Sequence, residues 1–478
     1  MAEPVQLRQT NLEIRLHPPG PPCRLATLHR GGRLGYYPYP RLDVLAPKPR
    51  RRRFRAFIIE NRFLQATIIP DLGAHLYRLY DRQNRQDCFA CPPVLKYGRV
   101  HLRGAWLPLG IEINFPIGHT VSTASPVRYA LRRGSDGSAS LCLACHHWCT
   151  RMHWEVHFTL RPDDARLHVH TRLSNPTDVP RGFMYWANAA VWVGWGFRMQ
   201  GRARMGDVWG QIIPFPVHNG RDWTWYRNRL HSSDLFAICP DQGWFGYYDH
   251  DRRYGMVHVA DPRIMPGKKF FSWGRSQDGL IWGHIFATEP RHYGEIQAGL
   301  AENQGLLSRI EPGQTIQFDE LWYPIAKLGD VIQASQHLAA GLSVTTATTP
   351  QPELRLICPT DRHVQVQVSA STRTLLDRRL ALQAGRCTCL PLPAWPEQER
   401  LRLVIRQGSQ VLLAGQLQQP EQADEAERLA YTRARDAAVP TDPLGRARRE
   451  LDYNAFADVR PLLRQARPKE DPSNPIPL

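Results

Sequence analysis

The chain has 478 residues, 42% of them hydrophobic and 10% aromatic, which is enough to build a sizeable core in two or three domains. This composition excludes an intrinsically disordered protein. The formal net charge of +17 is typical of some nucleic-acid-binding proteins, but nearly all the basic residues are arginines scattered singly along the chain, so we do not expect nucleic acid as a partner.

Residues 1–53 are predicted to contain one strand, Leu12–Leu16, followed by a Pro- and Gly-rich stretch and a dense basic run. We interpret the basic run, Lys48–Arg55, as a solvated loop that leads into the strand Phe54–Ile59. Residues 1–30 lack the apolar segment of a secretory signal, and no apolar run is long enough to span a membrane. We therefore expect a cytoplasmic protein with no membrane partner, whose ten cysteines are reduced thiols.

Residues 54–327 carry short alternating segments separated by Gly, Pro, Asn and Asp, with no helical period of comparable length. So many short strands in succession predict a mainly β chain with a large antiparallel sandwich or barrel, rather than a parallel α/β fold. The predicted strands include Leu64–Ile69, Trp154–Leu160, Phe183–Val193, Leu280–Thr288 and Gly294–Leu300.

After Pro324 the pattern changes. Residues 328–352 are predicted to form a helix and a Ser/Thr/Pro linker, because apolar residues recur at helical spacing up to Leu342. Residues 353–419 alternate again and suit a small β-sandwich. Residues 420–478 are predicted to form a helical, partly disordered tail, with helix-prone stretches at Glu421–Ala438 and Pro443–Arg464. A protein partner, if the chain has one, is expected to bind through this C-terminal region.

The segment 106–121 (WLPLGIEINFPIGHTV) combines polar and apolar residues in an unusual pattern. Apolar residues at 111, 113 and 115 alternate with Glu112 and Asn114, and His119 follows. This alternation predicts a strand with one buried face and one polar face. We interpret the polar face as one wall of a carbohydrate site.

Five segments in the predicted strand region together resemble a known family. They are 70–74 (PDLGA), 110–119 (GIEINFPIGH), 183–191 (FMYWANAAV), 270–274 (FFSWG) and 294–299 (GEIQAG). They resemble a bacterial domain family of unknown function that often precedes tetratricopeptide repeats and is related to galactose mutarotase (aldose epimerase). The resemblance implies a galactose-mutarotase-like supersandwich over residues 54–327. Helical repeats usually follow such a domain, but no repeat of that period is visible here.

In mutarotases a glutamate on a late strand takes the proton of the anomeric hydroxyl, while a histidine donates a proton to the ring oxygen. The resemblance places this glutamate at Glu295. Alternation puts Glu295 and Gln297 on the same face of their strand, as a site-lining pair requires. A solvent-facing glutamate on an amphipathic strand is the alternative.

The acid is harder to assign. Mutarotases carry Asn-His ahead of an aromatic strand, whereas Asn188 here has no histidine beside it. Glu112 offers a second carboxylate, and together with Glu295 it would permit the two-acid chemistry of glycosidic cleavage. Four histidines are candidate substitutes, although a lone histidine in a β protein is more often structural. They are His119, His258, His284 and His292.

Sugar sites combine polar groups with exposed aromatic planes, and all but one of the 14 tryptophans lie between Trp106 and Trp322. Any single tryptophan can equally belong to the core, and Asp249 and Arg263 can equally be turn residues. The predicted catalytic residues are Glu295 and Glu112. The predicted substrate-binding residues are Asn114, His119, Trp186, Asn188, Asp249, His258, Arg263, Trp273 and Gln297.

No cofactor and no metal is predicted. Cys142 and Cys145 with His146 match the haem-attachment spacing, and the two cysteines could also contribute to a zinc site with Cys88 and Cys91. In a strand, however, residues three apart point to opposite faces and do not readily share a metal. Phosphate-binding loops, nucleophile elbows and dinucleotide fingerprints are absent from the sequence, so phosphoryl transfer, serine hydrolysis and nicotinamide chemistry lack their usual motifs.

The leading hypothesis is a carbohydrate-active protein that binds a mono- or oligosaccharide in a supersandwich cleft. Carboxylate acid/base catalysis would act at the anomeric centre or at a glycosidic bond, as in an aldose-epimerase-like enzyme or a glycoside hydrolase. The alternative is a non-catalytic sugar-binding or protein-interaction module. A weaker third hypothesis is nucleic-acid association through Arg50–Arg55.

Overall fold

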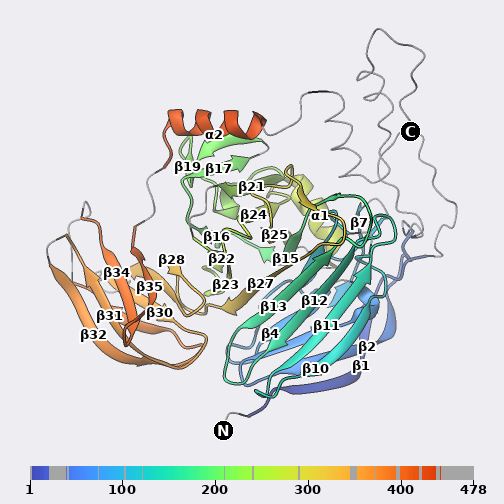
Figure 1. Cartoon of the computed structure of the whole chain (residues 1–478), viewed down its shortest axis with the longest axis horizontal. Helices are drawn as coiled ribbons and strands as arrows, with labels where there is room; N and C mark the ends of the chain where they lie inside the picture. The colour runs from blue at the N-terminus through green and yellow to red at the C-terminus, as the bar shows by residue number, and fades with distance from the viewer. Residues whose placement is uncertain are drawn as a thin grey trace.

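The computed structural model describes most of the chain in a mainly β architecture. The described residues are 3–20, 39, 42, 44–73, 75–101, 104–120, 122–208, 210–238, 242–288, 291–344, 352–371, 373–393, 399–418, 422–437 and 442. Figure 1 shows a large β body, a smaller β-sandwich beside it and a helix, α2, above the large body. The second helix-prone stretch, Pro443–Arg464, and the predicted disordered tail lie outside the described residues.

One layer of the large body is a 13-stranded sheet. Its strands run in the order β18-β17-β21-β24-β25-β15-β9-β4-β3-β2-β1-β6, with β5 paired to β4. Their bounds are β1 (Gln6–Leu16), β2 (Arg50–Glu60), β3 (Leu64–Ile68), β4 (His75–Asp81), β5 (Gln86–Asp87), β6 (Val94–Leu95), β9 (Ile111–Asn114), β15 (Trp186–Val193), β17 (Met205–Val208), β18 (Gln211–Pro214), β21 (Ser233–Ile238), β24 (Gly267–Ser272) and β25 (His292–Gly299).

The second layer is an 8-stranded antiparallel sheet that packs on the first, and Figure 1 shows its strands β10 to β13 in front of β1, β2 and β4. Alternation in β12 buries Trp154, Val156 and Phe158 in the same apolar cluster as Ile111 and Ile113 of β9. The predicted large sandwich is therefore confirmed. The strands are β10 (Arg128–Arg133), β11 (Ala139–His146), β12 (His153–Leu160), β13 (Leu167–Ser174), β16 (Phe197–Gly201), β22 (Trp244–Asp249), β23 (Tyr254–Ala260) and β27 (Thr315–Pro324).

Short elements complete the large body. Three two-stranded ribbons lie at its margins, and two 3-10 turns precede β4 and β21. The ribbons are β7 (Gly98–His101) with β8 (Gly104–Trp106), β14 (Arg181–Phe183) with β26 (Ser308–Ile310), and β19 (Val217–His218) with β20 (Arg221–Asp222). The turns are η1 (Pro70–Leu72) and η2 (Tyr226–Asn228).

The smaller body is the predicted β-sandwich, with a core of its own. Its sheets have the orders β28-β29-β30-β33 and β32-β31-β34-β35. The strands are β28 (Val331–Ala334), β29 (Ala339–Val344), β30 (Pro352–Ile357), β31 (Arg362–Ser369), β32 (Thr374–Leu382), β33 (Thr388–Pro391), β34 (Arg402–Gln407) and β35 (Gln410–Gln416).

The helix predicted within residues 328–352 is wrong, because this segment supplies β28 and β29. Leu338, Ala340 and Leu342 also alternate at strand spacing, and they pack into the core of the small sandwich. Ala339 on the other face is buried against the large body. Pairing with β30 and burial on both faces outweigh the local helical pattern, so the sandwich begins at Val331 rather than at residue 353.

The strand predicted at Leu280–Thr288 is also wrong, because α1 (Gln277–Phe286) lies there. Side chains four residues apart meet on one face of a helix, and Trp282 and Phe286 are in ring contact at 5.4 Å. The apolar run therefore packs as a helix beside β25. The predicted C-terminal helix is confirmed as α2 (Glu425–Ala437). Neither of these two described helices is long and apolar enough to cross a bilayer.

The basic run is a strand rather than a loop. Arg50–Arg53 are the exposed first residues of β2, which pairs with β1 along its whole length. Arg51 forms an ion pair with Glu13 at 2.8 Å on the surface. The solvated character of the run is as predicted, and the ladder with β1 explains its extended conformation.

Candidate active site

Strand register gathers polar side chains on the outer face of the 13-stranded sheet. Asn188 of β15 lies opposite Glu112 of β9 on one side and Gln297 of β25 on the other. The row continues to His75 of β4 and to Lys269 of β24. Directly opposed residues of antiparallel strands share a face, so the row crosses five strands on one side of the sheet.

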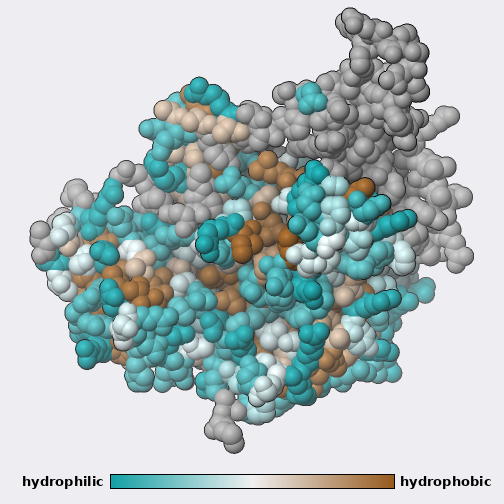
Figure 2. All heavy atoms as spheres, viewed as in Figure 1, coloured by the Kyte–Doolittle hydropathy of each residue, from teal (hydrophilic) through white to brown (hydrophobic). Residues whose placement is uncertain are grey.

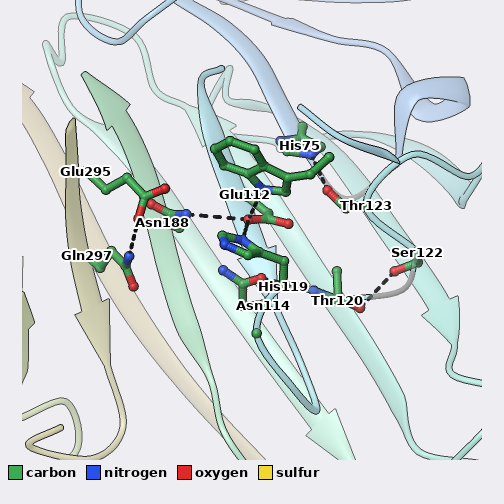
Figure 3. A network of polar contacts seen from close by, with 12 residues as sticks. His75, Glu112, Asn114, His119, Thr120, Ser122, Thr123, Asn188, Glu295 and Gln297 are labelled. Carbon is green, nitrogen blue, oxygen red and sulfur yellow. Dashed lines mark hydrogen bonds and ion pairs between the residues drawn. The ribbon is translucent and has the colours of Figure 1, made fainter. Parts of the chain in front are cut away.

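The residues between these positions face the opposite way. Ile111, Ile113, Ala187, Ala189 and Ile296 belong to the core between the two large sheets. The alternation predicted for β9 and β25 is therefore present, and Glu112 and Glu295 lie on the same face of the sheet. Figure 3 shows the Glu112 group and the Glu295–Gln297 group on different strands, with Asn188 between them.

Glu112 is 1% exposed and is held in place by three donors. Its Oε2 accepts hydrogen bonds from His119 Nδ1 at 2.7 Å, Trp106 Nε1 at 3.0 Å and Asn188 Nδ2 at 3.4 Å. Burial alone would raise the pKa of Glu112, but the charges of His119 and His75 and these hydrogen bonds lower it to about 2. Glu112 is therefore a buried carboxylate anion.

His119 is the partner of that anion and reaches the surface. Burial disfavours the imidazolium, but the adjacent Glu112 carboxylate raises the pKa of His119 above its ordinary value, with a further contribution from Glu295. Because Nδ1 bonds to Glu112, Nε2 is the nitrogen free to meet a ligand, and the side chain is 26% exposed. Asn114 Oδ1 accepts the backbone N–H of Thr120 at 3.1 Å, which secures the loop that carries His119.

Glu295 is oriented by two neutral donors. Tyr293 donates its hydroxyl to Oε1 at 3.1 Å, and Gln297 Nε2 donates to Oε2 at 2.6 Å. Gln304 Nε2 in turn donates to Gln297 Oε1 at 2.8 Å, which fixes the orientation of that amide. Burial and the neighbouring Glu295 raise the pKa of Tyr293 far above its usual range, so the phenol remains a donor.

Lys269 lies at the other end of the hydrogen-bond chain that runs from Glu295 through Gln297 and Gln304. Lys269 Nζ is 2.6 Å from Asp234 Oδ1 and donates to Gln304 Oε1 at 2.6 Å. The ammonium also lies 5.4 Å from each of the Phe236 and Phe271 ring centroids. Lys269 is buried, its charge is matched by Asp234, and it donates a further hydrogen bond to Gln304.

His119, Glu295 and Lys269 line a pocket of about 320 Å³. One wall is aromatic: Trp106 meets Phe286 edge-on at 5.2 Å, and Trp273 stacks on Trp282 at 4.1 Å. Figure 2 shows hydrophobic side chains gathered near the centre of the view, where Figure 1 labels β15 and β25. The pocket is lined by Trp106, Asn114, Gly118, His119, Met184, Asp234, Lys269, Phe271, Trp273, Phe286, Glu295, Gln297 and Gln304.

Two larger hollows, of about 830 and 530 Å³, lie on the outer face of the 8-stranded sheet. In the larger hollow His170 is paired with Asp319 at 2.8 Å, and His168 is paired with the adjacent Asp164 at 2.9 Å. The hollow of about 530 Å³ brings Glu155 beside Trp148 and Trp154, but this carboxylate is hydrogen-bonded to His157 and lies 3.8 Å from Arg172. The Glu295 carboxylate in the smaller pocket is instead held by neutral donors. We therefore place the candidate site in the smaller pocket.

The prediction that Glu112 contacts the ligand is not supported. The carboxylate does not line the pocket, because His119 stands in front of it. Eight lining residues were missed by the sequence analysis: Trp106, Gly118, Met184, Asp234, Lys269, Phe271, Phe286 and Gln304. Continued alternation through 269, 271 and 273 could have identified two of these positions, whereas Asp234 and Gln304 carry no local signal.

Asp249 and Arg263, which were predicted to bind substrate, lie in turns outside the pocket. Asp249 Oδ1 accepts the backbone N–H groups of Asp251 and Arg252 at the end of β22. Arg263 is 87% exposed and pairs with Asp261 at 2.6 Å. Neither residue lines the pocket, and both follow the turn interpretation that the sequence left open.

Three of the four candidate histidines also lie outside the pocket. His258 is buried in the 8-stranded sheet and bonds to Glu320 at 3.0 Å. His284 is exposed in α1, and His292 begins β25 without reaching the pocket. Among the four histidines proposed as acids, His119 alone lines the pocket.

Trp186, which was predicted to bind substrate, is packed in the interior and does not line the pocket. Its indole is 1% exposed, meets Phe236 edge-on at 5.8 Å and covers the Cα of Gly299. A Cβ atom at Gly299 would overlap the indole ring, so only glycine fits there without a shift.

We expect Gly299→Ala to destabilise the protein by about 1–3 kcal/mol through overpacking against Trp186. The midpoint of denaturant unfolding measures this effect. Gly201→Ala is the matched control, because a Cβ there meets Phe245 at an ordinary 3.6 Å. Equal stability of the two variants would contradict the packed role of Trp186.

The described residues contain no cluster of three or more His, Cys, Asp or Glu side chains suited to a metal ion. None of the described cysteines forms a disulfide bond. Cys142 and Cys145 lie on β11, where a spacing of three directs their side chains to opposite faces.

One family model and several solved structures are similar to this chain. A family model described as a domain of unknown function (DUF5107) matches residues 33–325. A TPR-domain containing protein from Parabacteroides distasonis is similar at 24% identity with a TM-score of 0.63, over 68% of this chain and 56% of that protein. A putative aldose 1-epimerase from Klebsiella pneumoniae has 11% identity and a TM-score of 0.41, over 57% of this chain and 80% of its own. A galactose mutarotase-like protein from Clostridium acetobutylicum has 12% identity and a TM-score of 0.41, over 57% and 96%.

Proposed function

The chain belongs to the DUF5107 family, a domain of unknown function, and we propose that it binds an aldose sugar in the pocket on the 13-stranded sheet and interconverts its anomers. One observation carries the proposal. His119, backed by the buried Glu112 anion, and Glu295 line a single pocket of about 320 Å³. An imidazolium and a carboxylate in one small pocket supply the acid and the base that ring opening needs.

The proposed reaction has one proton leaving the sugar and one arriving. The Glu295 carboxylate takes the proton of the anomeric hydroxyl, while His119 Nε2–H gives its proton to the ring oxygen. The bond between the anomeric carbon and the ring oxygen then breaks and an open-chain aldehyde forms. After rotation about the adjacent C–C bond, the former ring oxygen attacks the other face of the aldehyde and the C–O bond forms again. His119 takes its proton back from that oxygen, and Glu295 returns its proton to the carbonyl oxygen, which gives the other anomer. Glu112 acts through His119, because its negative charge favours the imidazolium form.

The remaining lining residues suit a sugar. Trp106, Phe271 and Trp273 offer apolar surface for the C–H face of a pyranose ring. Asn114 and Gln297 offer amide groups that can exchange hydrogen bonds with hydroxyls. A concave site with a few fixed polar groups and an aromatic wall is typical of small-ligand binding.

Glycosidic cleavage by two carboxylates is less well supported. That mechanism needs a second carboxyl group that reaches the glycosidic oxygen or a water molecule. Glu112, the second carboxylate predicted from the sequence, is 1% exposed and bonded to His119, Trp106 and Asn188. Asp234, the other carboxylate that lines the pocket, is engaged in an ion pair with Lys269 at 2.6 Å. Proton transfer between His119, Glu295 and a sugar hemiacetal needs no second carboxylate.

The test is anomer exchange measured by NMR saturation transfer on glucose, galactose, mannose and xylose with purified protein. We expect faster exchange for at least one aldose, with a rate that saturates as sugar concentration rises. Binding detected by calorimetry without faster exchange would favour the non-catalytic sugar-binding module. Absence of both binding and exchange across the panel would refute the proposed function.

A further inference from the structure

The charges of the pocket cancel in pairs except for one. His119 is matched by Glu112 at 2.7 Å, and Lys269 is matched by Asp234 at 2.6 Å. Among the described residues, the hydrogen-bond partners of Glu295 are the neutral Tyr293 and Gln297. With His119 protonated, the pocket therefore carries an excess of one negative charge, contributed by Glu295.

Lys269 is the lining residue that could bind a phosphate or carboxylate of a ligand. A lysine ammonium is a strong point charge for anions when its donors are free. Here Asp234 and Gln304 both engage the ammonium group, and the side chain is 6% exposed. Among the described lining residues there is no arginine and no other lysine.

The hydrogen-bonding groups beside Asp234 and Glu295 also disfavour an anionic ligand. Asp234 and Glu295 are carboxylates, which accept hydrogen bonds and donate none. Sugar hydroxyls can donate to them, whereas a phosphate dianion or a uronate carboxylate only accepts. An anionic substituent would also meet two like charges in a partly buried site, where repulsion is stronger than in water.

We infer that the site selects uncharged aldoses and excludes sugar phosphates and uronates, with Asp234 as the residue that sets this specificity. The inference rests on the proposed function and names its substrate class. Asp234 neutralises Lys269, which would otherwise attract the anionic group of a phosphorylated sugar.

Calorimetry on the full chain tests the selectivity with matched ligands. Glucose and galactose are compared with glucose 6-phosphate, galactose 6-phosphate and glucuronate at constant ionic strength. We expect each anionic sugar to bind at least tenfold more weakly than its neutral counterpart. Equal or tighter binding of the anionic sugars would overturn the inference while leaving the proposed function standing. Absence of binding by either class would overturn both.

Asp234→Asn provides a gain-of-function test of the cause. Loss of the carboxylate removes a like charge and frees Lys269, so the ratio of anionic to neutral sugar affinity should rise at least tenfold. Asp261→Asn is the control, because Asp261 is paired with Arg263 outside the pocket. An unchanged ratio in a folded Asp234→Asn protein would overturn the role of Asp234. If the variant does not fold, the wild-type ratio decides the inference.

Discussion

Glu295→Gln is expected to reduce anomer interconversion by roughly 10²–10⁴-fold, the range typical of a lost general base. The variant keeps the size of the side chain and an oxygen that can accept from Tyr293, which donates to Oε1 in the wild type. It removes the negative charge that takes the proton from the anomeric hydroxyl. NMR exchange rates measure the loss, and calorimetry with the same aldose should still detect binding.

Glu311→Gln is the matched control for this variant. Glu311 pairs with Arg309 at 2.8 Å on the surface and lies outside the pocket. We expect wild-type exchange from the control and equal thermal midpoints for the control and the wild type. Retention of more than a tenth of the wild-type rate in folded Glu295→Gln protein would remove Glu295 from the mechanism.

Glu112→Gln is expected to lower the rate and to move its pH dependence. In the wild type the Glu112 charge raises the pKa of His119, so the imidazolium acid is lost only as pH rises through that raised value. Without the charge, the pKa of His119 falls and the acid is lost at lower pH. The alkaline limb of the rate profile should therefore shift towards acid, with a loss of roughly 10–100-fold at neutral pH.

The matched control is Glu320→Gln, which alters a second buried Glu–His pair. Glu320 accepts from His258 at 3.0 Å and from Tyr185 at 2.8 Å, away from the pocket. Both variants should lower the thermal midpoint, because each disturbs a buried hydrogen-bonded pair. Only Glu112→Gln should shift the pH profile. If the alkaline limb of the pH–rate profile is the same in Glu112→Gln and in the wild type, Glu112 has a purely structural role.

Much of the fold and part of the site follow from local patterns. Alternation in β9 separates Ile111 and Ile113 from Glu112, and alternation in β25 places Glu295 and Gln297 together on the other face from Ile296. A strand shows its two faces in its own sequence, so these assignments need no knowledge of its neighbours. The mainly β class and the small sandwich are confirmed for the same reason. The C-terminal helix is also confirmed, because helix-forming composition is likewise a local signal.

The rest depends on which strands become neighbours. The sequence does not show that His119 folds over Glu112, or that Lys269 meets Asp234 across the β21–β24 ladder. His258 lies in an alternating strand pattern like those of the site residues. In the structure, however, its side chain points into the interior and bonds to Glu320. Register and partner choice come from tertiary packing, which single-strand periodicity does not encode.

Two of the wrong secondary-structure predictions, those for residues 328–352 and 280–288, have a common cause. Short apolar runs fit both a helix and a strand, so the surroundings decide. Residues 328–344 form strands because β29 within this segment pairs with β30. Residues 277–286 instead cover the aromatic end of the pocket, where Phe286 packs against Trp106, and form α1.

A crystal structure of the Glu295→Gln protein with a neutral aldose tests the central claim most directly. We expect the sugar in the pocket of the 13-stranded sheet, with its anomeric hydroxyl within hydrogen-bond distance of the side chain at position 295. The ring oxygen should face His119 Nε2, and a C–H face should lie against Trp106 or Trp273. A sugar bound in the hollows of the 8-stranded sheet, or with its anomeric carbon turned away from both His119 and position 295, would contradict the account.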